Sequence, residues 1–91
     1  MNDHQLLTEV CKMCAERFHV KNYIDILDPG RVATTAQARA FAMFILRQKH
    51  CWTHAKIGQA FGRDYSTCVH ACQKINRAID DAEWIKQIIE S

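Results

Sequence analysis

The stretch "IGQAFGRDYSTCVHACQKI", residues 57–75, decides the fold of this chain. Its first part is short and ends at Gly62, and glycine commonly closes helices. Its second part begins with small polar residues that favour a helix start. An apolar stripe follows at steps of four, three and four residues: Cys68, Cys72, Ile75 and Ile79. Two helices joined by a glycine-bearing turn predict a helix-turn-helix over about residues 53–79.

The N-terminal third of the sequence also has a helical pattern. Asn2 or Asp3 can cap a first helix. Its apolar stripe consists of Leu6, Leu7, Val10, Cys14 and Phe18. The segment "HVKNYIDIL", residues 19–27, adds another short turn of helix. The Asp-Pro-Gly at 28–30 then breaks the chain, because this tripeptide favours a turn.

The remaining segments complete an all-α fold of about five to six helices. Thr34 or Thr35 is expected to cap a central helix over 36–49, which is apolar nearly all round and therefore buried. Thr53 is expected to cap a short helix that ends at Gly62. Further cap candidates, for the longer helix that follows, are Asp64 and Ser66. A last apolar segment covers 81–90.

The composition is that of an ordinary globular protein. The chain has 91 residues, 48% hydrophobic and 24% charged, with one proline and three glycines. This fits one domain over residues 1–91 with a single modest core. No apolar run reaches the roughly 18 residues that span a bilayer, and the N-terminus lacks the basic start and apolar centre of a signal peptide. We expect a cytoplasmic protein with no membrane partner.

Five cysteines at irregular spacing argue against a disulfide framework and for a reducing compartment. Cys11 and Cys14 form a CxxC, and His50, Cys51 and His54 cluster further on. Structural zinc usually needs two paired motifs, and a thioredoxin-like site needs a βαβ pattern; neither is evident. We therefore expect no metal and no cofactor. The helical cysteines are interpreted as small apolar residues: Cys11, Cys14, Cys68 and Cys72.

Charge is strongly segregated along the chain. Residues 31–77 hold one acid, Asp64, and eight bases: Arg31, Arg39, Arg47, Lys49, Lys56, Arg63, Lys74 and Arg77. The two ends are net acidic, so the formal charge of +2 conceals a basic centre. A basic stripe over a helix-turn-helix favours a polyanion partner, because Lys and Arg release counterions when they neutralise phosphates. Double-stranded DNA is the expected partner.

The same residues carry a resemblance to a known family. "IGQAFGRDYSTCVHACQKI" resembles the signature of the C-terminal DNA-binding domain of the bacterial chromosomal replication initiator DnaA, approximately "IGxxFGGRDHTTVxHAxxKI". "ARAFAMFIL" and "ERFHVKNYIDIL" resemble earlier helices of that domain, so the likeness extends to about residue 79. It implies an all-α, Trp-repressor-like helix-turn-helix that reads a short asymmetric DNA box through both grooves. It also implies a bacterial or phage-encoded, nucleoid-associated protein.

The resemblance also implies roles for individual residues. Arg39 falls where the family places a minor-groove arginine. The positions that meet base edges and flanking phosphates in the major groove are Asp64, Tyr65, Ser66 and Thr67. Further DNA-binding candidates are Lys56, Arg63, His70 and Lys74. From the residues alone, Asp64 could equally be a helix cap, Thr67 could bond within its helix, and His70 is better read as a packing or phosphate-adjacent residue.

The sequence departs from the family pattern at three points. Tyr65 stands where the family usually has histidine, and a phenol differs from an imidazole in reach and hydrogen bonding. One glycine is missing from the turn. The segment "DPGRVATT", residues 28–35, contains Arg31 as its one basic residue, where the family has a basic run. Fewer phosphate contacts predict weaker and less salt-sensitive binding than in the family.

No GxxxxGK[ST] phosphate loop occurs in the 91 residues. We therefore expect a stand-alone DNA-binding domain that occupies DnaA-box-like sites as a competitor or transcriptional regulator. No catalytic residues stand out, so an enzyme is not expected. Nonspecific DNA binding is one alternative. The other is an adaptor that binds the replication initiator or another protein through the C-terminal helix. The apolar binding surface of such an adaptor would consist of Trp52, Trp84, Ile88 and Ile89. We interpret these residues instead as packing against the core.

Overall fold

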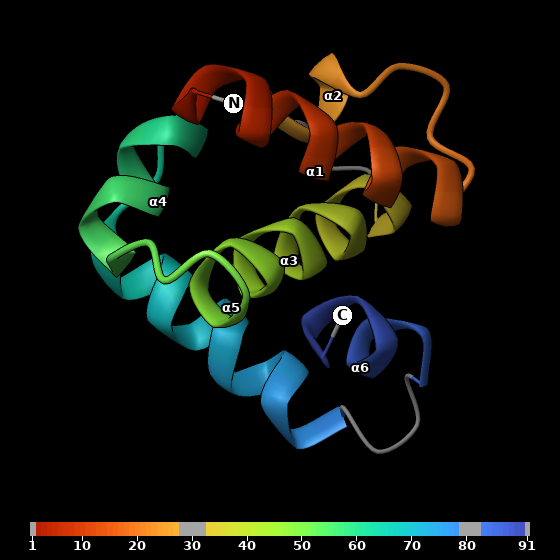
Figure 1. Cartoon of the computed structure of the whole chain (residues 1–91). Coiled ribbons are helices and arrows are strands. Elements are labelled where there is room, and N and C mark those ends of the chain that lie inside the picture. The colour runs from red at the N-terminus through yellow and green to blue at the C-terminus, as the bar shows by residue number, and fades with distance from the viewer. Residues whose placement is uncertain (1, 28–32, 79–82, 91) are drawn as a thin grey trace.

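The computed structural model describes residues 2–27, 33–78 and 83–90, without the side chains of Ala33, Thr34, Ala78, Trp84 and Ile85. The described residues form six helices (Figure 1): α1 Asp3–Arg17, α2 Ile24–Leu27, α3 Ala33–Gln48, α4 His54–Phe61, α5 Tyr65–Ala78 and α6 Glu83–Glu90. The predicted all-α fold and the short second helix are confirmed. The Asp-Pro-Gly tripeptide and Ile79 lie outside the described residues.

Helix α1 begins at a capping box. The Asn2 side chain accepts a hydrogen bond from the Gln5 backbone N–H at 2.8 Å, and the Gln5 side chain accepts one from the Asn2 N–H at 3.1 Å. Two backbone donors of the first turn are thereby satisfied. Of the two predicted caps, Asn2 is the residue used.

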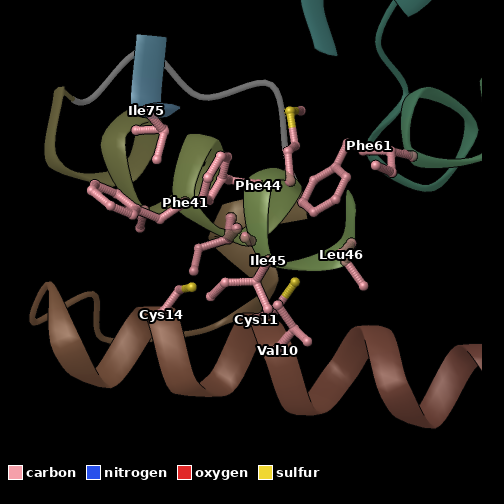
Figure 2. Packing of buried hydrophobic residues seen from close by; sticks show 14 of the residues in the cluster. Val10, Cys11, Cys14, Phe41, Phe44, Ile45, Leu46, Phe61 and Ile75 are labelled. Atoms are coloured by element: carbon pink, nitrogen blue, oxygen red, sulfur yellow. The ribbon is translucent and has the colours of Figure 1, made fainter. Parts of the chain in front are cut away.

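Helix α3 is the centre of the molecule and contacts each of the other helices. Every residue from Phe41 to Leu46 is buried, as expected for a helix that is apolar on all sides. Figure 2 shows the core around it, with Val10, Cys11 and Cys14 of α1 directed at its aromatic and aliphatic side chains. Phe61 of α4 and Ile75 of α5 complete this core from the other elements.

The turn between α4 and α5 depends on two glycines. Gly62 has φ 63° and caps α4 in the left-handed conformation, which glycine adopts without strain. Gly58 lies inside α4, where its carbonyl accepts a hydrogen bond from the Arg63 N–H at 2.8 Å. A Cβ on Gly58 would lie 2.7 Å from the Arg63 carbonyl oxygen. The absence of a side chain therefore lets the turn pass directly over α4.

The predicted caps of α3, α4 and α5 have different outcomes. Thr53 caps α4 as predicted, accepting a hydrogen bond from the Lys56 N–H at 3.1 Å. Helix α5 begins at Tyr65, and the Asp64 carbonyl accepts from the Cys68 N–H at 3.3 Å. Asp64 thus has the cap position, and Ser66 lies inside the helix.

The prediction that Thr34 or Thr35 caps the central helix is wrong. Helix α3 begins at Ala33, so both threonines belong to its first turn. Thr35 is buried. The helix therefore begins about one turn earlier than capping preferences indicated.

The CxxC cysteines are core residues. Cys11 and Cys14 are fully buried as free thiols, and burial raises the pKa of each to about 12. Cys68 and Cys72 are buried on the inner face of α5. The interpretation of all four as small apolar residues is confirmed.

The residues proposed for an adaptor face close the core. Trp52 is buried, and Ile88 and Ile89 of α6 are partly buried against the core. The side chain of Trp84 lies outside the described residues. Among the described helices, none has the length and apolar character needed to cross a membrane.

Candidate nucleic-acid interface

Helix α5 has one buried and one exposed face. The buried face consists of Cys68, Cys72 and Ile75. The residues predicted to contact DNA here are all exposed: Asp64, Tyr65, Ser66, Thr67, His70 and Lys74. The structure therefore gathers six of the nine predicted site residues on the first three turns of one helix and at its start. Side chains with this placement can reach base edges when a helix enters a major groove.

A groove between α3 and α5 borders one side of this exposed face. It is lined by Ala36, Arg39, Ala40, Met43, Arg63, Thr67 and Ala71. Arg63 is partly buried, and its Nε atom is buried without a hydrogen-bond partner among the described residues. A buried guanidinium donor of this kind is costly until an acceptor reaches it. The wall of the groove therefore contains a guanidinium whose Nε has no partner among the described residues.

A second groove borders the other side of α5, next to the start of α4 and the end of α3. Its lining residues are Arg47, Gln48, His54, Val69, Cys72, Gln73 and Asn76. Arg47 donates a hydrogen bond to the Trp52 carbonyl at 3.0 Å, which fixes its guanidinium beside the connection to α4. The sequence did not predict Arg47, His54 or Gln73 as site residues. For Gln73, four-residue steps from Tyr65 through Val69 were a signal that it lies on the same stripe of the helix.

Arg39 forms hydrogen bonds within the protein. It is 6% exposed, and its Nε donates to the Ile26 carbonyl at 2.6 Å while a second guanidinium nitrogen donates to the Asp25 carbonyl at 3.3 Å. In this conformation two nitrogens of the guanidinium are directed at α2. The last carbonyls of a helix lack partners within that helix, and Arg39 satisfies two of them in α2. A minor-groove role stays a prediction.

Lys56 also has partners within the protein. Its Nζ lies 2.7 Å from the Asp3 carboxylate at the start of α1 and 4.4 Å from the centre of the Trp52 ring. Figure 1 shows the start of α1 beside α4, which explains the pairing. The structure therefore separates Lys56 from the α5 group of predicted residues.

The basic centre of the sequence is not one continuous exposed stripe. Arg39 is buried, Arg47 and Arg63 are partly buried, and Arg31 lies outside the described residues. The exposed cations of the described part of this segment are Lys49, Lys56, Lys74 and Arg77. The distribution of charge along the sequence therefore overstates the charge presented on the surface.

The glycine-dependent turn, the buried inner face of α5 and its exposed polar start define a helix-turn-helix DNA-binding domain. The family described as "Bacterial dnaA protein helix-turn-helix" matches residues 7–75. The chain belongs to this family.

Two relatives extend the comparison to whole proteins. The chain is 38% identical over 69 residues to the chromosomal replication initiator protein DnaA of Bifidobacterium animalis subsp. lactis, covering 75% of this chain and 12% of the relative. It is 34% identical over 80 residues to that of Pelobacter propionicus, covering 87% of this chain and 18% of the relative. The chain thus spans a small part of the length of these relatives.

Proposed function

We propose that this domain recognises DnaA-box-like sites in double-stranded DNA and serves replication control or transcription regulation. The observation that carries the proposal is the exposed start of α5. Asp64, Tyr65, Ser66 and Thr67 lie together at a helix start, where small polar side chains and backbone N–H groups suit base edges and phosphates.

The two grooves beside α5 support the same mode of binding. An α-helix in a major groove lies between two sugar-phosphate backbones, so contacts on both of its sides are needed to fix its register. One groove has Arg63 and Thr67 in its lining, and the other has Arg47 and His54. Each therefore supplies a guanidinium that can donate to phosphate oxygens.

Fluorescence-anisotropy binding at two salt concentrations tests the proposal. The probes are a duplex carrying a DnaA box and a duplex of the same composition with the box scrambled. Selective binding of the box is expected, with a loss of selectivity in Thr67→Ala. Thr8→Ala is the matched control, because it removes the same atoms from α1, where Thr8 bonds the His4 carbonyl.

The alternatives give different results in the same experiment. Equal affinity for both duplexes, falling with salt, identifies a nonspecific DNA binder. Absence of binding to either duplex rules out both DNA-binding functions for these residues. Selectivity that survives Thr67→Ala would leave the box-reading function standing and remove Thr67 from the contact set.

A further inference from the structure

His54 and Tyr65 form an aromatic pair across the helix-turn-helix. Their ring centroids are 6.1 Å apart and the ring planes meet at 78°, an edge-to-face arrangement. His54 is the first residue of α4 and Tyr65 the first residue of α5, so the pair joins the starts of the two helices. Tyr65 is 63% exposed, one of two large hydrophobic residues exposed in the described chain. This exposure leaves most of the phenol ring available to a ligand.

The backbone on both sides of His54 is firmly held. The Trp52 N–H donates to the Leu46 carbonyl at 3.1 Å, and the Trp52 carbonyl accepts from Arg47 at 3.0 Å. On the other side, the Lys56 N–H donates to the Thr53 side chain at 3.1 Å and closes the first turn of α4. His54 itself is half-buried beside Val69 and Gln73, which follow Tyr65 at four-residue steps on α5. His54 therefore has a fixed position next to the stripe of α5 that begins at Tyr65.

An exposed tyrosine without such a neighbour would populate several rotamers. Ordering it only when DNA binds would reduce both affinity and selectivity, because lost rotamer freedom opposes association. Edge-to-face contact with a fixed ring favours one orientation by about two- to tenfold, the range expected for aromatic pairs. The phenol hydroxyl is then presented to base edges at a defined position.

We propose that His54 is a positioning residue that fixes the Tyr65 ring and so sets the base preference at the box position that Tyr65 contacts. The inference rests on the box-reading function proposed above. It assigns no DNA contact to His54.

The experiment measures base preference one position at a time. Anisotropy titrations use a DnaA-box duplex and a panel in which each base pair of the box is replaced in turn by the three others. The variants are His54→Ala, His54→Phe, Tyr65→Ala and the double variant His54→Ala with Tyr65→Ala. His4→Ala, an exposed histidine of α1, is the matched control.

The proposal expects a loss of preference confined to one position. His54→Ala reduces the base preference at that position by about two- to tenfold. Tyr65→Ala reduces the preference at the same position, and the double variant shows the same preference as Tyr65→Ala. His54→Phe keeps the preference because it keeps a ring. If His54→Ala does not fold by circular dichroism, His54→Gln replaces it with the same expectation.

Four results would overturn the proposal. Uniform weakening on every duplex would show that His54 acts through stability or phosphate contact, and a loss at a different position from Tyr65→Ala would separate the two residues. Unchanged preference in His54→Ala, with clear preference in the wild type, refutes the positioning role alone. A wild type without any base preference refutes the box-reading function, and the inference with it.

Discussion

Helix α5 has an apolar face that is buried in the core and a polar face that is exposed to solvent, and residues of the two faces alternate closely along the sequence. Cys68, Cys72 and Ile75 are buried against α3 and α4, while Ser66 and Thr67, one or two residues away, are exposed. One helix therefore attaches the residues predicted to contact DNA to the core and presents them to solvent. Stability and DNA binding are expected to separate by face, and each prediction below tests this separation.

Ile75→Ala is expected to have the largest effect, on stability. Removing a buried isoleucine side chain leaves a cavity and costs about 2–5 kcal/mol. Lys74→Ala, at the adjacent and exposed position, is expected to change stability by less than about 0.5 kcal/mol. Urea unfolding followed by circular dichroism measures both. Equal effects of the two substitutions would show that the faces are not energetically distinct.

Arg39→Met is expected to act like a core substitution. It keeps much of the side-chain length but removes the hydrogen bonds to the Ile26 and Asp25 carbonyls, at a cost of about 1.5–3 kcal/mol. Thr67→Ala, which lies beside the same groove but is exposed, should leave stability nearly unchanged. Thermal unfolding compares the two. Unchanged stability together with lost DNA binding would favour the minor-groove role predicted for Arg39.

Gly58→Ala tests the turn that orients the two faces. The added Cβ would lie 2.7 Å from the Arg63 carbonyl oxygen, so the turn must shift, at a cost of about 1–3 kcal/mol. Gly62→Ala has open space but a φ of 63°, and is expected to cost about 1–2 kcal/mol. We also expect Gly58→Ala to reduce selectivity for the box more than Gly62→Ala does, measured under conditions in which both variants are fully folded. Identical selectivity of the two variants would contradict this.

Alkaline pH is expected to lower the stability of the fold, because the thiols on the buried face of α5 then favour the unfolded chain. Burial raises the pKa of Cys72 from 9.0 to about 11. Above pH 9 the unfolded chain loses this proton while the folded chain keeps it, so stability is full below pH 9 and falls as the pH approaches 11. The slope is at most about 1.4 kcal/mol per pH unit for each such thiol.

Urea unfolding at pH 8 and pH 10 measures this loss. Cys72→Ala should lose less stability between the two pH values than the wild type. Cys51→Ser, at an exposed cysteine, should lose as much as the wild type. An unchanged pH response in Cys72→Ala would show that this thiol does not contribute.

The smallest expected effect distinguishes two residues of the exposed face. Lys74→Ala should weaken binding to box and scrambled duplexes alike and reduce the salt dependence by about one counterion unit. Thr67→Ala should weaken binding to the box by about 0.5–1.5 kcal/mol and leave the salt dependence unchanged. Anisotropy titrations over a salt series measure both. The reverse pattern would exchange the roles of the two residues.

Local sequence features predicted most of the helices and the position of the helix-turn-helix, but not the start of α3, which lies earlier than the expected capping residues. The cap at Thr53, the stop at Gly62 and the period of Cys68, Cys72 and Ile75 are local features, and local hydrogen bonding and side-chain spacing decide them. The exposed polar start of α5 follows from the same period. The burial of the CxxC cysteines was also readable from their places on an amphipathic helix.

Only the tertiary structure decided the partners of the long polar side chains. Arg39 bonds carbonyls 13 and 14 residues away, Lys56 pairs with Asp3 on α1, and the ring of His54 meets that of Tyr65 across the turn. A flexible or aromatic side chain can reach several neighbours, and the packing of separate helices determines which is within reach. The family resemblance marked Arg39 and Lys56 as DNA-contact candidates, and only the folded chain shows that both also have partners within the protein.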